Sequence, residues 1–177
     1  WDAPELAKRF PRWSMATHGM RNTATNHLMG DGWWAWWIPL KGGDVSIGIV
    51  WDQRRAEMPE EGPIAGRIKS FLLEKHPAAA EMMADATAVE GDVHWRRNLS
   101  WRPRQLARDG VVLVGDAAGF MDPFYSPGLD WMAYTTARAS FLICRQLAGA
   151  TDVATLVEQH NRDFARSYER WFAALYR

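Results

Sequence analysis

The sequence predicts a mixed α/β protein, and three features support this prediction. Residues 111–114 are four consecutive branched aliphatic residues, a run typical of a short, fully buried strand because it has no polar face. Residues 33–39 and 45–51 are apolar runs that fit two strands joined by a glycine-rich turn. From residue 129 to 148, and again from 152 to 176, apolar residues recur at helical spacing. We therefore expect small sheets covered by helices.

Composition excludes several classes of function. The 177 residues suggest one domain or a piece of one, and 21 basic residues balance 21 acidic ones, so no field attracts nucleic acid or an anionic membrane. The only cysteine, Cys144, lies on a helical apolar stripe, where we expect it to be buried, and the five histidines show no metal-binding spacing. No apolar run reaches the roughly 18 residues of a membrane span. We expect a cytoplasmic protein without metal, nucleic acid or membrane span.

The first part of the chain predicts a sheet. A short helix is expected over Glu5–Phe10 and a turn at residues 29–32. Strand alternation over residues 33–39 places Trp34, Trp36 and Ile38 on one face, and Pro39 ends the ladder. The other face carries Trp33, Ala35 and Trp37. After a hairpin signal at residues 41–44, a partner strand carries Val45, Ile47, Ile49 and Trp51 on one face and Ser46, Gly48 and Val50 on the other. Both faces of the predicted sheet are apolar enough to predict packing on both sides. Asn26 and His27, just before the turn, either lie on one of these faces or serve a structural role.

Two helices and one strand are predicted next. Ile64, Ile68 and Phe71 share a helix face that ends before Pro77. A second helix is expected over residues 78–86, and a strand over residues 93–101. The helices are expected to cover the sheet.

The strand at residues 111–114 leads into the most informative segment. A carboxylate, Asp116, follows Gly115 at the carboxyl end of this strand, where open α/β sheets bind ligands and where it could accept hydrogen bonds from a polyol. The chain then turns at residues 122–123 and 126–128 and enters a helix that runs to about residue 148, with Gly149 closing it. The N-terminus of this helix is directed back toward Asp116, so an anion or an electron-rich ring oxygen would be stabilised there. The stripe expected to be buried comprises Leu129, Met132, Ala133, Thr136, Ala137, Ser140, Phe141, Cys144, Leu147 and Ala148.

The last predicted helix covers residues 152–176 and is interpreted as ordinary packing. Its apolar face consists of Val153, Leu156, Val157, His160, Phe164, Tyr168, Trp171 and Leu175.

Two motifs carry a resemblance to a known family. The run DGVVLVGDAAGFMDPFYSPGLD, residues 109–130, resembles the second flavin-contacting motif of the FAD-dependent monooxygenase and halogenase superfamily. Trp34-Ala35-Trp36-Trp37-Ile38-Pro39 is similar to the WxWxIP signature of flavin-dependent halogenases. The resemblance implies a partial halogenase-like fold with FAD as cofactor. Gly115 and Asp116 would lie at the ribityl chain, Pro127, Gly128 and Leu129 at the pyrimidine end of the ring, and Trp34, Trp36, Ile38 and Pro39 along the wall between flavin and substrate.

The resemblance also implies an activity and its partners. The family halogenates organic, typically aromatic, small molecules by using reduced FAD and oxygen to oxidise halide, and a flavin reductase or NAD(P)H supplies the electrons. The expected domains are residues 1–98, a substrate-side sheet with covering helices, and residues 99–177, the C-terminal part of the FAD-binding domain. The GxGxxG unit and the catalytic lysine would belong to an N-terminal half outside this sequence, so no catalytic residue is assigned here.

The sequence departs from the family at the candidate halide turn, Ser126 and Gly128. Pro127 stands between them where the family has a residue with a backbone N–H, and Tyr125 stands where tryptophan halogenases carry a glutamate. The alternatives are therefore a hydroxylase or monooxygenase, or a geranylgeranyl-reductase-like flavin reductase, of the same superfamily. A non-enzymatic binding module with a tryptophan-lined groove is an alternative of a different class.

Overall fold

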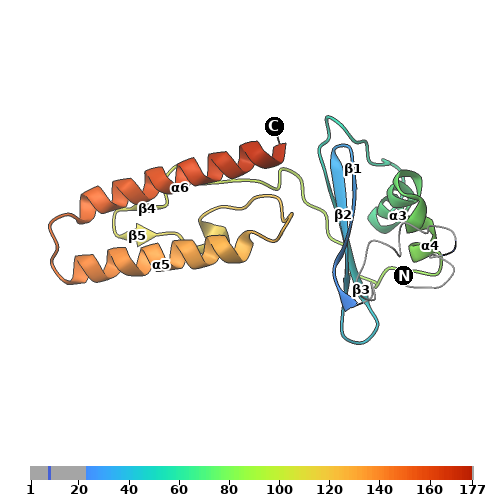
Figure 1. The fold of residues 1–177 in the computed structure, drawn as a ribbon, viewed down its shortest axis with the longest axis horizontal. Coiled ribbons are helices and arrows are strands. Elements are labelled where there is room, and N and C mark those ends of the chain that lie inside the picture. The colour runs from blue at the N-terminus through green and yellow to red at the C-terminus, as the bar shows by residue number, and fades with distance from the viewer. Residues whose placement is uncertain (1–7, 9–22, 177) are drawn as a thin grey trace. The chain divides into compact units, whose positions relative to one another are not determined.

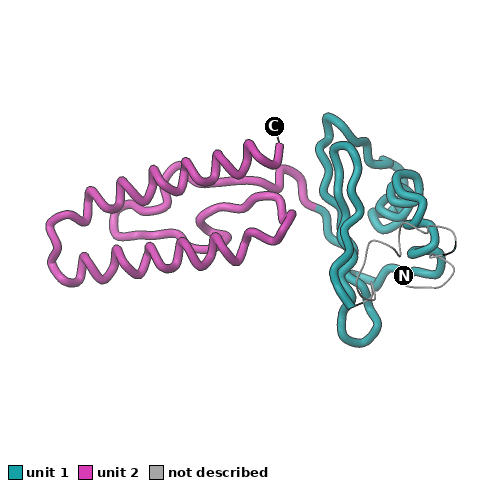
Figure 2. Tube along the Cα trace, in the orientation of Figure 1, with its two compact units in different colours: residues 1–95 teal, residues 96–177 magenta. Residues whose placement is uncertain are grey.

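A computed structural model describes residue 8 and residues 23–176 of the chain. These residues form a mixture of helices and small antiparallel sheets, which confirms the predicted α/β class. The helix expected over Glu5–Phe10 falls outside the described residues, apart from Lys8, which is helical. Figure 2 shows that the chain forms two compact units, residues 1–95 and 96–177. The functional roles expected for the two parts of the chain stay predictions.

The first unit is built on a three-stranded antiparallel sheet of order β1-β2-β3. Its strands are β1 (Asn26–Gly30), β2 (Trp33–Pro39) and β3 (Val45–Trp51). The hairpin between β2 and β3 is confirmed, and the Leu40 N–H closes it by donating to the Asp44 carbonyl at 2.8 Å. The turn predicted at residues 29–32 is wrong in part, because Met29 and Gly30 pair with Trp34 and Trp33 inside β1. The sequence of β1 is short and shows little alternation, and its pairing with β2 makes it a strand.

Two helices cover one face of this sheet, as predicted (Figure 1). They are α3 (Ile64–Lys75) and α4 (Pro77–Met83), and α4 ends earlier than expected. Trp37, Phe71 and Leu72 are fully enclosed, and the Trp33 and Phe71 rings meet edge to face with their centroids 5.4 Å apart. Pro77 begins α4, where a missing N–H is harmless, and His76 Nδ1 accepts a hydrogen bond from the Ala78 N–H.

The second unit is built on two long helices, α5 (Gly128–Leu147) and α6 (Val153–Tyr176), which lie side by side (Figure 1). A two-stranded ribbon of β4 (Ala107–Arg108) and β5 (Val111–Val112) packs beside α6. The Asn161 side chain of α6 fixes this ribbon, because it accepts from the Leu106 and Ala107 N–H groups and donates to the Ala107 carbonyl. The core of the unit contains Leu106, Ala118, Met121, Phe164 and Tyr168.

Two strand predictions in the second unit need correction. The fully buried strand over residues 111–114 is wrong, because only Val111 and Val112 pair and Val111 is 62% exposed. A ribbon of two short strands that packs against a single helix is covered on one side only, so its other side stays exposed. The strand expected over residues 93–101 is also wrong: within this segment only Trp101 makes a bridge, to Phe120, and Asn98 has a left-handed φ of 52° that interrupts extended backbone.

The helix after the turn has the predicted span but buries the opposite side. Thr135, Ala139 and Leu142 are buried, whereas Leu129 is 70% exposed and Cys144 is also exposed, so the expected burial of the apolar stripe and of the cysteine is wrong. Large aromatic contacts decide which side of α5 is buried, because Trp131 packs edge to face on Phe164 of α6 with the ring centroids 4.9 Å apart. The face predicted for α6 is largely confirmed, with His160, Phe164 and Tyr168 buried, but Trp171 is exposed.

Candidate functional site

The end of β5 is tied to the second turn of α5. The Gly115 N–H donates to Thr135 Oγ1 at 2.9 Å, and this hydroxyl donates to the Trp131 carbonyl at 2.7 Å. Thr135 has no exposed surface, so the link is shielded from water. It holds η2 (Gly115–Ala117), a single 3₁₀ turn, against α5.

Asp116 lies within this 3₁₀ turn, and its side chain is exposed. Among the described residues, no hydrogen bond or ion pair to its carboxylate is found. An unpaired, rigidly mounted carboxylate can accept hydrogen bonds from the hydroxyls of a bound polyol. The role of Asp116 in binding such a ligand stays a prediction.

The segment between Asp116 and α5 contains an unusual turn. Tyr125 and Ser126 are consecutive non-glycine residues with left-handed φ values of 60° and 54°. The turn is closed by the Ser126 N–H, which donates to the Pro123 carbonyl at 2.7 Å, and by Asp122 Oδ1, which accepts from the Phe124 N–H at 2.9 Å. Such conformations are uncommon without glycine, so the surroundings must hold this turn in place.

Pro127, Gly128 and Leu129 lie where this turn enters the helix. Pro127 is buried and precedes α5, which begins at Gly128, one residue before the predicted start. Gly128 and Leu129 are exposed, and the first hydrogen bond back to Pro127 comes from the Trp131 N–H. The N–H groups of the first helical turn have no partner within the helix, and they can donate to a ligand oxygen.

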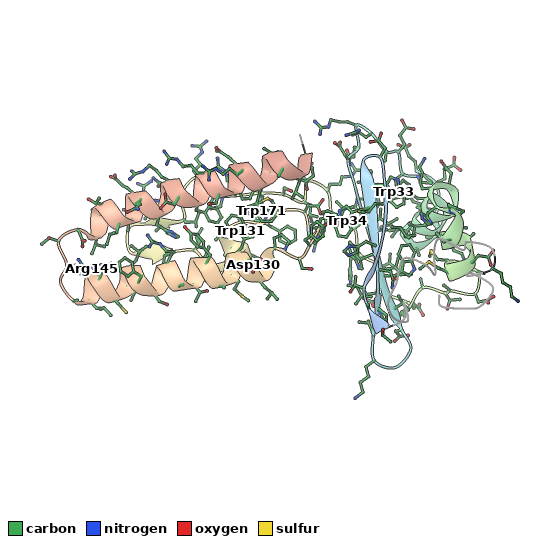
Figure 3. All side chains as sticks on the ribbon, in the orientation of Figure 1. Trp33, Trp34, Asp130, Trp131, Arg145 and Trp171 are labelled. Carbon is green, nitrogen blue, oxygen red and sulfur yellow. The ribbon has the colours of Figure 1, made fainter. Side chains whose placement is uncertain are left out.

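The predicted indole-lined surface lies in the first unit, on the sheet face that α3 and α4 do not cover. Trp34, Trp36 and Ile38 are half-buried there, and Trp33 and Trp34 point to opposite sides of β2 (Figure 3). The Trp34 ring lies 5.4 Å from the Trp36 ring and 5.3 Å from the His27 ring. His27 therefore shares this face, and Pro39 ends β2 beside it.

Two residues that the sequence reasoning left without a role shape this surface. Trp36 is paired with Gly48 of β3, and a Cβ atom added to Gly48 would lie only 1.9 Å from the Trp36 ring. The indole thus lies flat across the glycine, and its Nε1 donates to Ser46 Oγ at 3.4 Å. The alternation of β3 groups Ser46 and Gly48 on one face, and the pairing of β3 with β2 places that face beside Trp36.

The described residues contain neither a cluster of metal ligands nor a membrane-spanning helix. No group of three or more His, Cys, Asp or Glu side chains in this part of the chain could hold a metal ion. No helix in the same residues is both long and apolar enough to cross a bilayer.

An exposed carboxylate in a short turn that packs against a helix can accept hydrogen bonds from a ligand. Comparison with known proteins makes the assignment more specific. The family model described as tryptophan halogenase matches residues 13–176, so the chain belongs to this family.

Several relatives carry halogenase names. A tryptophan 2-halogenase of Chondromyces crocatus is 26% identical over 138 residues, which are 78% of this chain and 26% of that protein. A flavin-dependent halogenase of Aspergillus niger, otaD, is 25% identical over 140 residues, 78% of this chain and 29% of that protein. A flavin-dependent halogenase of Dictyostelium discoideum, chlA, is 30% identical over 112 residues, 62% of this chain and 18% of that protein. The chain thus spans about a quarter of the length of the first two relatives. No solved structure matches it significantly.

Proposed function

We propose that this chain forms part of an FAD-dependent halogenase that acts on an aromatic small molecule. The observation that carries the proposal is the exposed Asp116 carboxylate, whose turn is held against α5 by the Gly115–Thr135 hydrogen bond. Family membership and the relatives named as flavin-dependent halogenases support the same function. Because those relatives are several times longer than the matched region, we propose that the activity belongs to an enzyme that contains this chain together with an N-terminal FAD-binding half.

The residues present fit an FAD molecule. Asp116 would accept hydrogen bonds from the ribityl hydroxyls, and the first turn of α5, at Gly128 and Leu129, would face the pyrimidine end of the ring, where the Leu129 N–H would donate to an oxygen. Bound FAD, when reduced by a flavin reductase or NAD(P)H, supplies the chemistry that activates oxygen for halide oxidation. The chain's own contribution is to bind and orient the ring and, through Trp34 and Trp36, to exclude water near the substrate. We assign no proton transfer to these residues, since an indole only donates a hydrogen bond.

The halide step is the finer part of the proposal. Ser126 and Gly128 frame the candidate halide turn, and the Ser126 N–H is already bonded to the Pro123 carbonyl. Pro127 has no N–H to offer, so a halide ion would depend on the Gly128 N–H and the Ser126 hydroxyl. This observation favours, as the second candidate, a hydroxylase or monooxygenase of the same superfamily with no working halide site. Tyr125 is 73% exposed at this turn, in the position where tryptophan halogenases carry glutamate, and for this reason we propose an aromatic substrate other than tryptophan.

Titration of the apo-enzyme with FAD tests the proposal. Asp116→Ala removes a charge-assisted hydrogen bond worth roughly 1.5–3 kcal/mol, so the Kd for FAD is expected to rise about 10- to 150-fold. Asp109→Asn is the matched control, because Asp109 is an exposed carboxylate of the same unit whose ion pair with Arg108 lies on the surface. Its Kd should stay within about twofold of the wild-type value.

Three outcomes would contradict this function or part of it. An unchanged Kd in folded Asp116→Ala enzyme would remove Asp116 from the site. No FAD binding by the intact wild-type enzyme would favour a binding module. Product formation that requires oxygen but not halide would favour the hydroxylase.

A further inference from the structure

A chain of side-chain hydrogen bonds joins the end of α6 to the turn that precedes α5. The Tyr176 hydroxyl donates to Asp122 Oδ2 at 3.2 Å, and Ser100 Oγ lies 3.2 Å from the same hydroxyl. A phenol has one proton, so when it donates to Asp122 the Ser100 hydroxyl must be the donor to Tyr176. Asp122 is only 5% exposed, and its other oxygen accepts the Phe124 N–H. One buried carboxylate thus connects a side chain of α6 to the backbone of the turn.

A second tyrosine of α6 holds the chain just upstream of this carboxylate. The Tyr168 hydroxyl donates to the Phe120 carbonyl at 3.0 Å, and this carbonyl also accepts the Trp101 N–H at 2.8 Å. Tyr168 and Tyr176 lie two turns apart and therefore on the same side of α6. The segment from Phe120 to Asp122 is held at two points by one helix face.

The turn that follows requires such support. Tyr125 and Ser126 adopt left-handed conformations that residues with a side chain seldom adopt. The hydrogen bond from the Phe124 N–H to Asp122 lies at the start of the turn, and α5 begins directly after the end of the turn. A shift of the Asp122 carboxylate would therefore pass into the position of the first turn of α5.

We propose that Tyr176 is a positioning residue that, through Asp122, fixes the turn at residues 122–127 and the direction of the α5 N-terminus, and so sets how tightly this turn binds its anionic ligand. This inference rests on the proposed function for the identity of that ligand, halide. The pKa of Tyr176 is raised to about 12, chiefly by burial and also by the Asp122 charge, while the Ser100 hydrogen bond lowers it in part. The hydroxyl thus keeps its proton, and the link to Asp122, at any neutral or mildly alkaline pH.

Tyr176→Phe in the flavin-loaded enzyme tests the proposal with two measurements. The loss of one neutral hydrogen bond corresponds to about a 2- to 10-fold effect. We expect hydrogen exchange of the Phe124 and Ser126 amides to accelerate by about that factor, and the KM for halide to rise by a similar factor while kcat stays within about twofold. Ser100→Ala leaves the Tyr176–Asp122 bond in place, so it should give a smaller change in the same direction.

Tyr134→Phe is the matched control. Tyr134 lies on α5, and no hydrogen bond of its hydroxyl is found among the described residues, so its removal should change neither measurement. Unchanged exchange in Tyr176→Phe, or equal changes in Tyr134→Phe, would overturn the proposal. Faster exchange with an unaltered halide KM would overturn it as well. If the wild-type enzyme uses no halide, the proposed halogenation fails, and the exchange measurement alone decides whether Tyr176 positions the turn.

Discussion

His160 offers the sharpest test of the packing between α5 and α6. Its side chain has no exposed surface, and neither ring nitrogen has a hydrogen-bond partner within the described residues. The Tyr134 ring lies 6.2 Å away. Burial lowers the pKa of His160, the Arg138 charge lowers it further, and the Asp163 charge opposes this shift. Two buried polar atoms without partners make this histidine a cost to stability rather than a contribution.

We therefore expect His160→Leu to stabilise the protein or leave it unchanged at pH 7.5. An unmet buried polar group costs about 1–3 kcal/mol, and imperfect packing of a leucine offsets part of that gain. A net gain of about 1 kcal/mol would raise the Tm by about 2–4 °C in a protein of this size. Thermal unfolding followed by circular dichroism measures this shift.

The same variant should remove part of the acid sensitivity. The pKa of His160 is lower in the folded protein than the ordinary histidine pKa near 6.5. Below pH 6.5 the unfolded chain therefore binds more protons than the folded one, and stability is lost as the pH falls toward the folded-state pKa. Each unit of lowering corresponds to about 1.4 kcal/mol. His94→Leu is the control for the loss of an exposed imidazole, because His94 is 79% exposed, and it should change the free energy of unfolding at pH 7.5 by no more than about 0.5 kcal/mol. Destabilisation of His160→Leu by more than about 1 kcal/mol at pH 7.5, or a pH profile identical to wild type, would refute the reasoning, because the ring would then have a partner.

Two further predictions concern the first unit. Gly48→Ala should destabilise the protein by about 1–3 kcal/mol in thermal unfolding, because the new methyl group collides with the Trp36 ring. Gly66→Ala on α3 is the control: its methyl group would meet only Pro63 Cγ, at 3.9 Å, so it should stabilise the protein by about 0.5–1 kcal/mol. Equal effects would show that Trp36 does not lie on Gly48. In the intact enzyme, Trp34→Phe and Trp36→Phe should leave flavin reduction unchanged but increase the peroxide released per NAD(P)H consumed, since smaller rings exclude less water. Slower flavin reduction with unchanged peroxide release would contradict the lining role.

Local patterns were sufficient to predict most of the elements and the family. The alternation of β2 and β3, the hairpin between them, and the spans of α3 and α6 depend on neighbours in sequence, and Pro77 and Gly149 mark helix ends through their own backbone constraints. The Gly115–Asp116 turn and the tryptophan motif were recognisable for the same reason. Each is a contiguous run that can be recognised without knowing which segments it will contact.

Only the tertiary structure decided which faces are buried and which segments pair. α5 carries small and apolar residues on more than one side, so its sequence alone could not show that Trp131 would dock on Phe164 and leave Leu129 exposed. β1 exists because β2 offers it a partner, and the hydrogen bond from Tyr176 to Asp122 joins residues far apart in the sequence. Burial and long-range hydrogen bonds depend on which surfaces meet, and the periodicity of a single segment carries no information about its partner.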